Sequence, residues 1–295
     1  MSTPLELTVG CRAIEVTDPV QRVRIPLWLL YPARAAERVE TFGVYALSVA
    51  LDAPIEGERL PLVVISHGTG STPWVMRDLA AYLVRAGFGV AVFAHPGNTR
   101  RDDGLAGTPQ NLVNRPRHVR LVIDAAFADP TIGARLSTNG VAVIGHSMGG
   151  YTALAAAGGR PMVLPHEAPD GVAYPLAVEA DPRVRAIVLF SPAAPWFMAD
   201  GALAEVDVPV MLRTGEKDLA APIAYDQFLL RGFRDRDRVD YQVVPNAGHF
   251  SFLTPFPPAL AGPLFPPSQD PPGFDREAFL PALYAEVLAF LRRVL

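Results

Sequence analysis

Residues 141–150 read Val-Ala-Val-Ile-Gly-His-Ser-Met-Gly-Gly, and this stretch decides how the rest of the chain is interpreted. Its first four residues are apolar and three of them are β-branched, which predicts a buried strand ending at Gly145. The small residues from Tyr151 to Ala157 favour a helix soon after the glycines. Ser147 is therefore expected on a sharp turn between a strand and a helix, an arrangement called a nucleophile elbow.

The two glycines around the serine have a physical reason. Gly145 and Gly149 stand two residues before and two residues after Ser147, where a sharp turn leaves no room for side chains. A helix that begins at the serine directs its free N–H groups toward negative charge on a bound acyl oxygen. The alternative interpretation is a glycine-rich turn with an incidental serine.

Composition excludes several classes of protein. The chain has 295 residues, half of them hydrophobic, which is enough for one large α/β domain. A net charge of -4 shows no basic excess, so no nucleic-acid partner is expected. Cys11 is the single cysteine and excludes an intrachain disulfide. Six scattered histidines give no metal-ligand spacing, so neither a metal nor a cofactor is expected.

The sequence contains no pattern typical of a membrane protein. Residues Met1–Gly10 lack a basic region followed by an apolar run, so no signal peptide is predicted. No apolar stretch is long enough to cross a bilayer. We therefore expect a cytoplasmic protein with no membrane partner.

Strand and helix patterns alternate along the chain. Leu5–Val16 and Arg22–Tyr31 alternate apolar and polar residues and predict an antiparallel hairpin. The buried strands that follow are expected at 62–65, 89–94, 141–145, 184–190, 208–213 and 239–244. Helices are expected at 72–87, 116–129, 147–157, 222–231 and 275–294. This order predicts one α/β domain over 1–295, a mostly parallel doubly wound sheet behind an N-terminal antiparallel hairpin.

Four segments lack a readable period. Residues 32–59 are expected to be irregular and 99–115 to form a polar loop. Residues 158–182 are interpreted as a cap-like insertion over the carboxyl edge of the sheet. The proline-rich stretch 254–273 is interpreted as a surface wrap, with a pocket rim or a homodimer contact as alternatives.

A serine nucleophile needs a base, and the base needs an orienting acid. Loops at the carboxyl ends of parallel strands share one edge of the sheet, so partners of Ser147 are sought there. His249 follows the last strand and is the predicted base. Asp218 follows the strand at 208–213 and is the predicted acid, with Glu216 as its nearest competitor.

The other histidines receive structural interpretations. His67 is expected to support the loop after the strand at 62–65, and His95 to make local contacts. His146 is interpreted as a buried structural residue and His118 as a surface or interface residue. His166 lies in the insertion, where contact with substrate is an alternative.

An oxyanion hole needs two N–H donors near the reacting carbonyl. Met148, directly after the nucleophile, is expected to supply one donor. Thr69 is the best candidate for the second, because Gly68 and Gly70 allow close approach of the backbone to a ligand.

Two further groups concern the substrate. The aromatic residues Trp196, Phe197 and Phe250 are expected to line an apolar acyl pocket together with the insertion, and ordinary loop packing is the alternative. Arg100 and Arg101 either bind an acidic group of the substrate or belong to a solvated loop.

Four motifs carry a resemblance across nearly the whole chain. They are Ser-His-Gly-Thr-Gly at 66–70, Gly-His-Ser-Met-Gly-Gly at 145–150, Gly-Glu-Lys-Asp at 215–218 and Ala-Gly-His-Phe at 247–250. In this order the chain resembles a serine α/β-hydrolase. Less specific motifs resemble the predicted dienelactone hydrolases and their platelet-activating-factor acetylhydrolase-like relatives: Asp-Pro at 18–19, Arg-Ile-Pro-Leu-Trp at 24–28, Tyr-Pro at 31–32 and His-Pro-Gly-Asn at 95–98.

Two positions depart from that branch. Dienelactone hydrolases proper use a cysteine where this chain has Ser147. The acetylhydrolase relatives carry their acid at the place that reads Phe190-Ser191-Pro192 here, which supports Asp218 as the acid.

The expected function is hydrolysis of a small-molecule carboxylic ester through an acyl-enzyme on Ser147, His249 and Asp218. A lactonase, an amidase or a polyester hydrolase on the same triad is the alternative among enzymes. A non-catalytic ligand-binding protein with a hydrolase fold is the alternative from another class.

Overall fold

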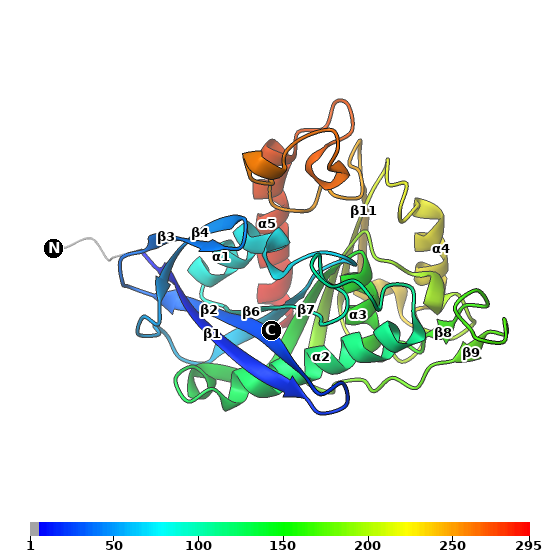
Figure 1. Ribbon diagram of the computed structural model, residues 1–295, viewed down its shortest axis with the longest axis horizontal. Coiled ribbons are helices and arrows are strands. Elements are labelled where there is room, and N and C mark those ends of the chain that lie inside the picture. Colours follow the sequence, from blue (N-terminus) through cyan, green and yellow to red (C-terminus); the bar gives the residue numbers. More distant parts are fainter. Residues whose placement is uncertain (1–5) are drawn as a thin grey trace.

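The computed structural model describes residues 6–295, and in them a mixed sheet is covered by helices on both faces (Figure 1). The strands of this sheet are β1 (Thr8–Asp18), β2 (Val23–Ala33), β3 (Arg38–Phe42), β4 (Tyr45–Leu51), β5 (Leu60–Ser66), β6 (Gly89–Phe93), β7 (Leu136–His146), β10 (Val184–Phe190), β11 (Val210–Gly215) and β12 (Val239–Val244). Two short strands, β8 (Met162–Val163) and β9 (Tyr174–Pro175), pair separately.

The helices alternate with the strands. The α-helices are α1 (Arg77–Arg85), α2 (Pro109–Ala128), α3 (Met148–Ala156), α4 (Ile223–Gly232) and α5 (Arg276–Val294). Short 3-10 turns are η1 (Pro73–Met76), η2 (Gly133–Arg135), η3 (Pro195–Phe197), η4 (Arg236–Arg238), η5 (Pro258–Leu260) and η6 (Pro266–Ser268).

The sheet has the order β12-β11-β10-β7-β5-β6-β2-β1-β4-β3. Strands β12 to β6 in this order are parallel to one another, whereas β2 runs antiparallel to both β6 and β1. The prediction of a mostly parallel doubly wound sheet with an N-terminal antiparallel hairpin is therefore confirmed. Leu5, the first residue of the predicted hairpin, lies outside the described residues.

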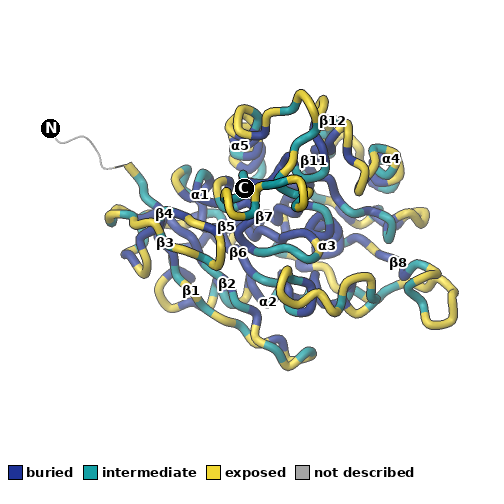
Figure 2. The backbone as a smooth tube through the Cα atoms, turned by 45° about the horizontal axis from the view of Figure 1, so that its top comes forward, coloured by how far each residue is buried: buried dark blue, intermediate teal, exposed yellow. Residues whose placement is uncertain are grey.

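Buried side chains on both faces explain why the central strands are apolar throughout. In β5, Leu62 and Val64 join a core that contains residues of α2 and α3, whereas Val63 and Ile65 join a core that contains residues of α1 and α5. Strand side chains alternate between faces, so a strand between two helical layers needs apolar residues at every position. In Figure 2 the strands form the buried centre of the molecule and exposed backbone surrounds them.

Residues 32–59 are not irregular, which corrects the prediction for this segment. They contain the hairpin of β3 and β4, and Tyr45, Leu47 and Val49 are buried on one side of β4. Gly43 occupies the turn with a φ of +67°, a conformation that glycine adopts readily. The large apolar residues at every second position, Tyr45, Leu47 and Val49, were the available sequence signal.

Helix α2 begins at Pro109, seven residues before the predicted start, so residues 109–115 are not part of a loop. Thr108 caps the helix by accepting a hydrogen bond from the Asn111 N–H at 3.2 Å. Polar residues in the first turns made the segment look like a loop, but Asn111, Asn114 and Arg115 are fully buried.

The segment 158–182 leaves the sheet at the other end from the one predicted. Helix α3 starts at the carboxyl edge and runs away from it, so the residues that follow emerge far from that edge. The N–H of Gly159 bonds to Leu154 and that of Asp181 to Ala156, both near the end of α3. In Figure 2 the loop beside β8 projects outward and is largely exposed.

Packing around the elbow predicts the effect of one added methyl group. A Cβ atom on Gly145 would overlap with the Gly149 backbone, so we expect Gly145→Ala to lower the free energy of unfolding by about 3 kcal/mol or more. Urea denaturation measures this change. Gly262→Ala is the matched control, because a Cβ there meets nothing within 4 Å. Equal stability of the two variants would contradict the packing argument.

Candidate active site

A cavity of about 310 Å³ lies at the carboxyl edge of the sheet and contains Ser147 and His249. Its walls come from the loop after β5, the elbow after β7, the loop after β12 and the proline-rich stretch. The lining residues are Tyr45, Gly68, Thr69, Gly70, Ser71, Thr72, Val75, Arg100, His146, Ser147, Ala220, His249, Phe250, Leu253, Phe256, Phe265 and Pro267. We call it the catalytic cavity.

Ser147 has the backbone of a nucleophile elbow. Its φ is +54° and its ψ is -118°, a conformation that costs a non-glycine residue on the order of 1–3 kcal/mol. The Ser147 N–H bonds to Phe190 of β10 at 3.0 Å, and α3 begins at the next residue, Met148. The strand before the serine and the helix after it therefore hold it in a strained position that exposes it to the cavity.

His249 and Asp218 form a hydrogen-bonded pair. Nδ1 of His249 lies 2.8 Å from Oδ2 of Asp218, and the aspartate side chain is completely buried. An ionised carboxylate only accepts hydrogen bonds, so Nδ1 carries the proton and Nε2 keeps a free lone pair. That tautomer is the one a general base requires.

Asp218 is held as a carboxylate. Burial disfavours its charged form, but hydrogen bonds from His249 and from the Ala221 N–H outweigh burial and lower its pKa. Ser191 lies at the place where the acetylhydrolase-like pattern has its acid, and its hydroxyl also lowers the pKa of Asp218. Glu216, the competing acid, is exposed and accepts a hydrogen bond from the Asn246 N–H.

His146 supports the base from beside the nucleophile. Its Nε2 donates to the His249 carbonyl at 2.8 Å, and the two rings lie 4.8 Å apart. Burial lowers the pKa of His146 to about 3, so the ring stays neutral next to His249. The interpretation of His146 as a buried structural histidine agrees with this arrangement.

The loop after β5 places Thr69 in the catalytic cavity, next to the elbow. Asn98 donates hydrogen bonds to Oγ1 of Thr69 at 2.7 Å and to Asp103 at 2.6 Å. Arg115 in turn donates to Oδ1 of Asn98 at 2.6 Å. Because residues 99–115 were predicted to form a polar loop, Arg115 was not expected to hold the loop after β5 in place.

Arg115 is a completely buried cation under the loop. It also donates to the His67 carbonyl, to Oγ of Ser66 at 3.3 Å and to Oγ1 of Thr152 at 2.8 Å. Burial lowers its pKa to about 9, so the guanidinium remains charged at neutral pH. One planar group therefore ties the end of β5 to α2 and α3.

A line of neutral histidines extends from this loop to the end of β1. Ser66 contacts Nε2 of His95 at 2.9 Å, and Nδ1 of His95 contacts Nδ1 of His118 at 3.0 Å. His118 ends the line 3.3 Å from Asp18. Nε2 of His118 faces two acceptors, Oε1 of Gln21 and Oδ2 of Asp18, so Nε2 carries the proton and each group donates to the next in the direction of Asp18.

This arrangement corrects the interpretation of His118 as a surface residue, since its exposed fraction is 0%. His118 also links Asp18, of the Asp-Pro motif at 18–19, to His95, of the motif at 95–98. Burial disfavours ionised Asp18, but hydrogen bonds from His118 and Arg117 lower its pKa. His67, as predicted, supports the loop, with Nδ1 donating to the Gly68 carbonyl at 2.7 Å.

Three of the residues predicted to line the substrate pocket lie elsewhere. Phe197 is buried against Tyr151, with ring centroids 5.3 Å apart, and Trp196 donates to Glu167 at 2.8 Å. His166 is exposed in the loop between β8 and β9. None of the three lines the catalytic cavity. His166 belongs to the insertion, which leaves at the far end of α3, whereas Trp196 and Phe197 lie in η3 and pack against Tyr151 of α3.

Phe250 does line the catalytic cavity. Two aromatic residues that the sequence analysis did not assign, Phe256 and Phe265, line it as well. Both belong to the proline-rich stretch 254–273, so that stretch forms a rim of the pocket, one of the alternatives considered for it.

Within residues 6–295, no group of three or more His, Cys, Asp and Glu side chains is arranged to hold a metal ion. In the same residues, no helix combines the length and the apolar character needed to cross a membrane.

Comparison with known proteins identifies the fold. A family model described as serine aminopeptidase, S33, matches residues 57–169, which include the loop after β5 and the elbow. A ferulic acid esterase from Streptomyces cinnamoneus is 17% identical with a TM-score of 0.69, covering 100% of this chain and 91% of that one. This chain has the α/β-hydrolase fold.

A dienelactone hydrolase from Anabaena variabilis has the same fold. It is 18% identical with a TM-score of 0.57, covering 98% of this chain and 99% of that one. The predicted fold class is thus confirmed, and the branch that the motifs resemble is represented among the similar structures. No curated protein matches the sequence.

The buried histidines predict how the stability of this protein depends on pH. Burial lowers the pKa of His67 and His146 to about 3 and also lowers that of His95 and His118. Below about pH 6.5 the unfolded chain binds protons that the folded chain does not, so the free energy of unfolding decreases as the pH is lowered. Each histidine contributes a slope of up to about 1.4 kcal/mol per pH unit.

Urea denaturation between pH 7 and pH 5 measures this slope. His118→Gln is expected to reduce the slope by up to about 1.4 kcal/mol per pH unit, which corresponds to one proton. His166→Gln, a change at an exposed histidine, is expected to leave it unaltered. A slope that responds equally to both substitutions would contradict the assignment to buried histidines.

Proposed function

We propose that this protein is a serine hydrolase that cleaves carboxylic esters through an acyl-enzyme intermediate. The observation that carries the proposal is the 2.8 Å contact from Nδ1 of His249 to a buried Asp218, with Ser147 and His249 in one cavity. The strained φ of Ser147 supports the same role, because strain of this kind persists where the surrounding structure needs it.

In the proposed mechanism, His249 removes the hydroxyl proton of Ser147 through Nε2 as the serine oxygen attacks the ester carbonyl. Asp218 fixes the tautomer of His249 and stabilises the imidazolium that forms. The Met148 and Thr69 N–H groups donate hydrogen bonds to the developing oxyanion.

The intermediate then loses the alcohol, which takes the proton from His249. A water molecule enters, gives a proton to His249 and attacks the acyl carbonyl. Collapse of this second intermediate releases the carboxylic acid and returns the proton to Ser147. Each step uses only the three triad side chains, the two backbone N–H groups and water.

Ester substrates are favoured by two considerations. An alcohol is a better leaving group than an amine, so esters require the least of the triad. The ferulic acid esterase of the same fold acts on an ester by its name, which is consistent with this choice.

Substitution of the nucleophile and of the acid tests the mechanism. We expect Ser147→Ala to lower kcat by at least about a thousandfold and Asp218→Asn by up to about ten-thousandfold. Glu216→Gln is the matched control, since Glu216 is two residues away and does not contact His249, and we expect it to change kcat by less than about twofold. p-Nitrophenyl esters of increasing chain length provide the assay.

Retention of most of the esterase activity in Ser147→Ala would overturn the proposal. Labelling of the wild-type protein at Ser147 by a fluorophosphonate distinguishes an enzyme from a non-catalytic protein of the same fold. Faster turnover of lactones, amides or polyester film than of aryl esters would assign one of the alternative activities to the same triad.

A further inference from the structure

A second cavity adjoins the catalytic cavity and has about twice its volume, about 610 Å³. We call it the aromatic cavity. The two share Tyr45, Ser71, Thr72 and Arg100 as lining residues and therefore lie next to each other. Among the residues that line the aromatic cavity are Trp28, Phe42, Trp74, Arg24, Arg100 and Arg101.

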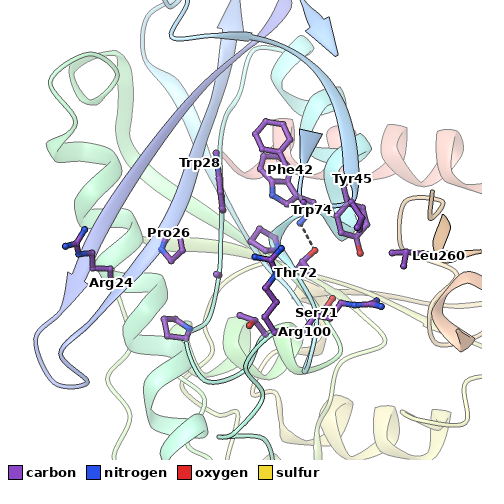
Figure 3. A pocket seen from close by; sticks show the side chains of 17 residues that line it. Arg24, Pro26, Trp28, Phe42, Tyr45, Ser71, Thr72, Trp74, Arg100 and Leu260 are labelled. Carbon is purple, nitrogen blue, oxygen red and sulfur yellow. Dashed lines mark hydrogen bonds between the residues drawn. The ribbon is translucent and has the colours of Figure 1, made fainter. Parts of the chain in front are cut away.

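Three aromatic rings gather on one side of this cavity (Figure 3). Phe42 and Trp74 are stacked, with centroids 3.9 Å apart and an interplanar angle of 22°. Trp28 meets Trp74 edge-on at 5.1 Å. Trp28 is inclined by 60° to Trp74 and by 79° to Phe42, so the three rings form an apolar corner in the cavity wall that suits another aromatic group.

The wall is connected directly to the predicted oxyanion loop. Trp74 is five residues after Thr69, and Thr72 between them caps η1 by accepting a hydrogen bond from the Trp74 N–H at 3.4 Å. Figure 3 shows this bond beside the cavity. Trp74 itself is buried behind the half-buried Trp28 and Phe42, so it links the accessible rings of the cavity to the loop that carries Thr69.

The charge of the lining is of one sign. Arg24, Arg100 and Arg101 line the cavity, and no aspartate or glutamate is among the described residues that do so. Arg100 lies over the ring of Phe265 at 4.8 Å, and Arg24 pairs with Glu15 at a solvent-exposed position. Arg101 is exposed, and an excess of guanidinium groups favours an anion.

We propose that the aromatic cavity binds the larger part of the ester substrate, and that this part is a flat aromatic group with an acidic substituent. The proposal rests on the proposed function, since it assigns a substrate class to the same Ser147. The aromatic group packs against the half-buried rings of Trp28 and Phe42, with Trp74 behind them, and the acidic substituent faces the arginines.

Phe42→Ala tests the aromatic wall. Phe42 is half-buried at the end of a hairpin, so its removal opens the wall without cutting into the central sheet. The control is Phe228→Ala, because Phe228 is a partly exposed aromatic residue on α4 that lines neither cavity. Circular dichroism and the urea midpoint verify that both variants are folded.

The substrates place a naphthyl group on either side of the ester. We measure kcat/KM for 2-naphthyl acetate, methyl 2-naphthoate and ethyl acetate. Phe42→Ala is expected to lower kcat/KM at least about tenfold for one of the naphthyl esters and less than about threefold for ethyl acetate. Equal effects on all three esters, or a similar loss in Phe228→Ala, would overturn the proposal.

Arg101→Gln tests the charge, because Arg101 lines only the aromatic cavity. The comparison is 6-carboxy-2-naphthyl acetate against 2-naphthyl acetate, or the corresponding acyl-side pair if the acyl side carries the effect. We expect the carboxylated ester alone to lose about threefold to fivefold in kcat/KM, and the loss to shrink at high salt. Arg292→Gln on α5 is the control, and no selective loss in Arg101→Gln would overturn the acidic part of the proposal.

A binding measurement separates this proposal from the proposed function. Isothermal titration calorimetry of Ser147→Ala with 2-naphthoate, with and without Phe42→Ala, reports on the cavity alone. Binding that Phe42→Ala weakens supports the aromatic cavity even if the wild-type protein hydrolyses no ester. Absence of binding beside measurable hydrolysis of ethyl acetate would overturn the cavity proposal and leave the proposed function intact.

Discussion

The elbow depends on the absence of two side chains. A Cβ atom on Gly145 would overlap with the backbone of Gly149, and one on Gly149 would overlap with the carbonyl of Ser66. The second contact joins the start of α3 to the end of β5, the strand that leads into the loop with Thr69. The same lack of space that holds Ser147 at a φ of +54° therefore also brings the loop to the nucleophile.

The loop after β5 is held in place by the buried guanidinium of Arg115 and by neutral histidine rings. Arg115 donates to Ser66, to the His67 carbonyl and to Asn98, and Asn98 donates to Thr69. A guanidinium without water is stable only when its donors are paired. Burial and the charge of Arg115 lower the pKa of His67 and His95, so both rings stay neutral. Neutral rings can accept and donate hydrogen bonds without adding a second buried charge.

The two cavities divide the chemistry between different parts of the chain. The triad comes from loops at the carboxyl ends of the parallel strands, as expected for an open α/β sheet. The aromatic cavity is built from the antiparallel end of the sheet, by Trp28 of β2 and Phe42 of β3, together with η1. Variation in the hairpins could thus change the substrate without changing the elbow.

Local patterns in the sequence were sufficient to predict the order of the elements and to propose the triad. Residues 141–150 specify a strand, a turn and a helix through contacts between near neighbours. Because carboxyl ends of parallel strands meet at one edge, the order of strands then brings Ser147, Asp218 and His249 together. Position in the sequence left Glu216 as a competitor of Asp218, and the structure has Asp218 buried against His249 and Glu216 exposed.

The lining of the pocket depended on tertiary structure. The insertion 158–182 was expected near the substrate because it follows the nucleophile helix, but α3 carries it to the far end. Phe256 and Phe265 line the cavity from a proline-rich stretch that has no period to interpret. In the sequence Arg115 falls in a predicted polar loop and His118 is a predicted surface or interface residue of a helix, and only the packing of α2 against α3 and β1 buries them. The sequence by itself thus determined the fold and the predicted triad through local periodicity and strand order, whereas the packing of distant segments decided the pocket walls and the buried network.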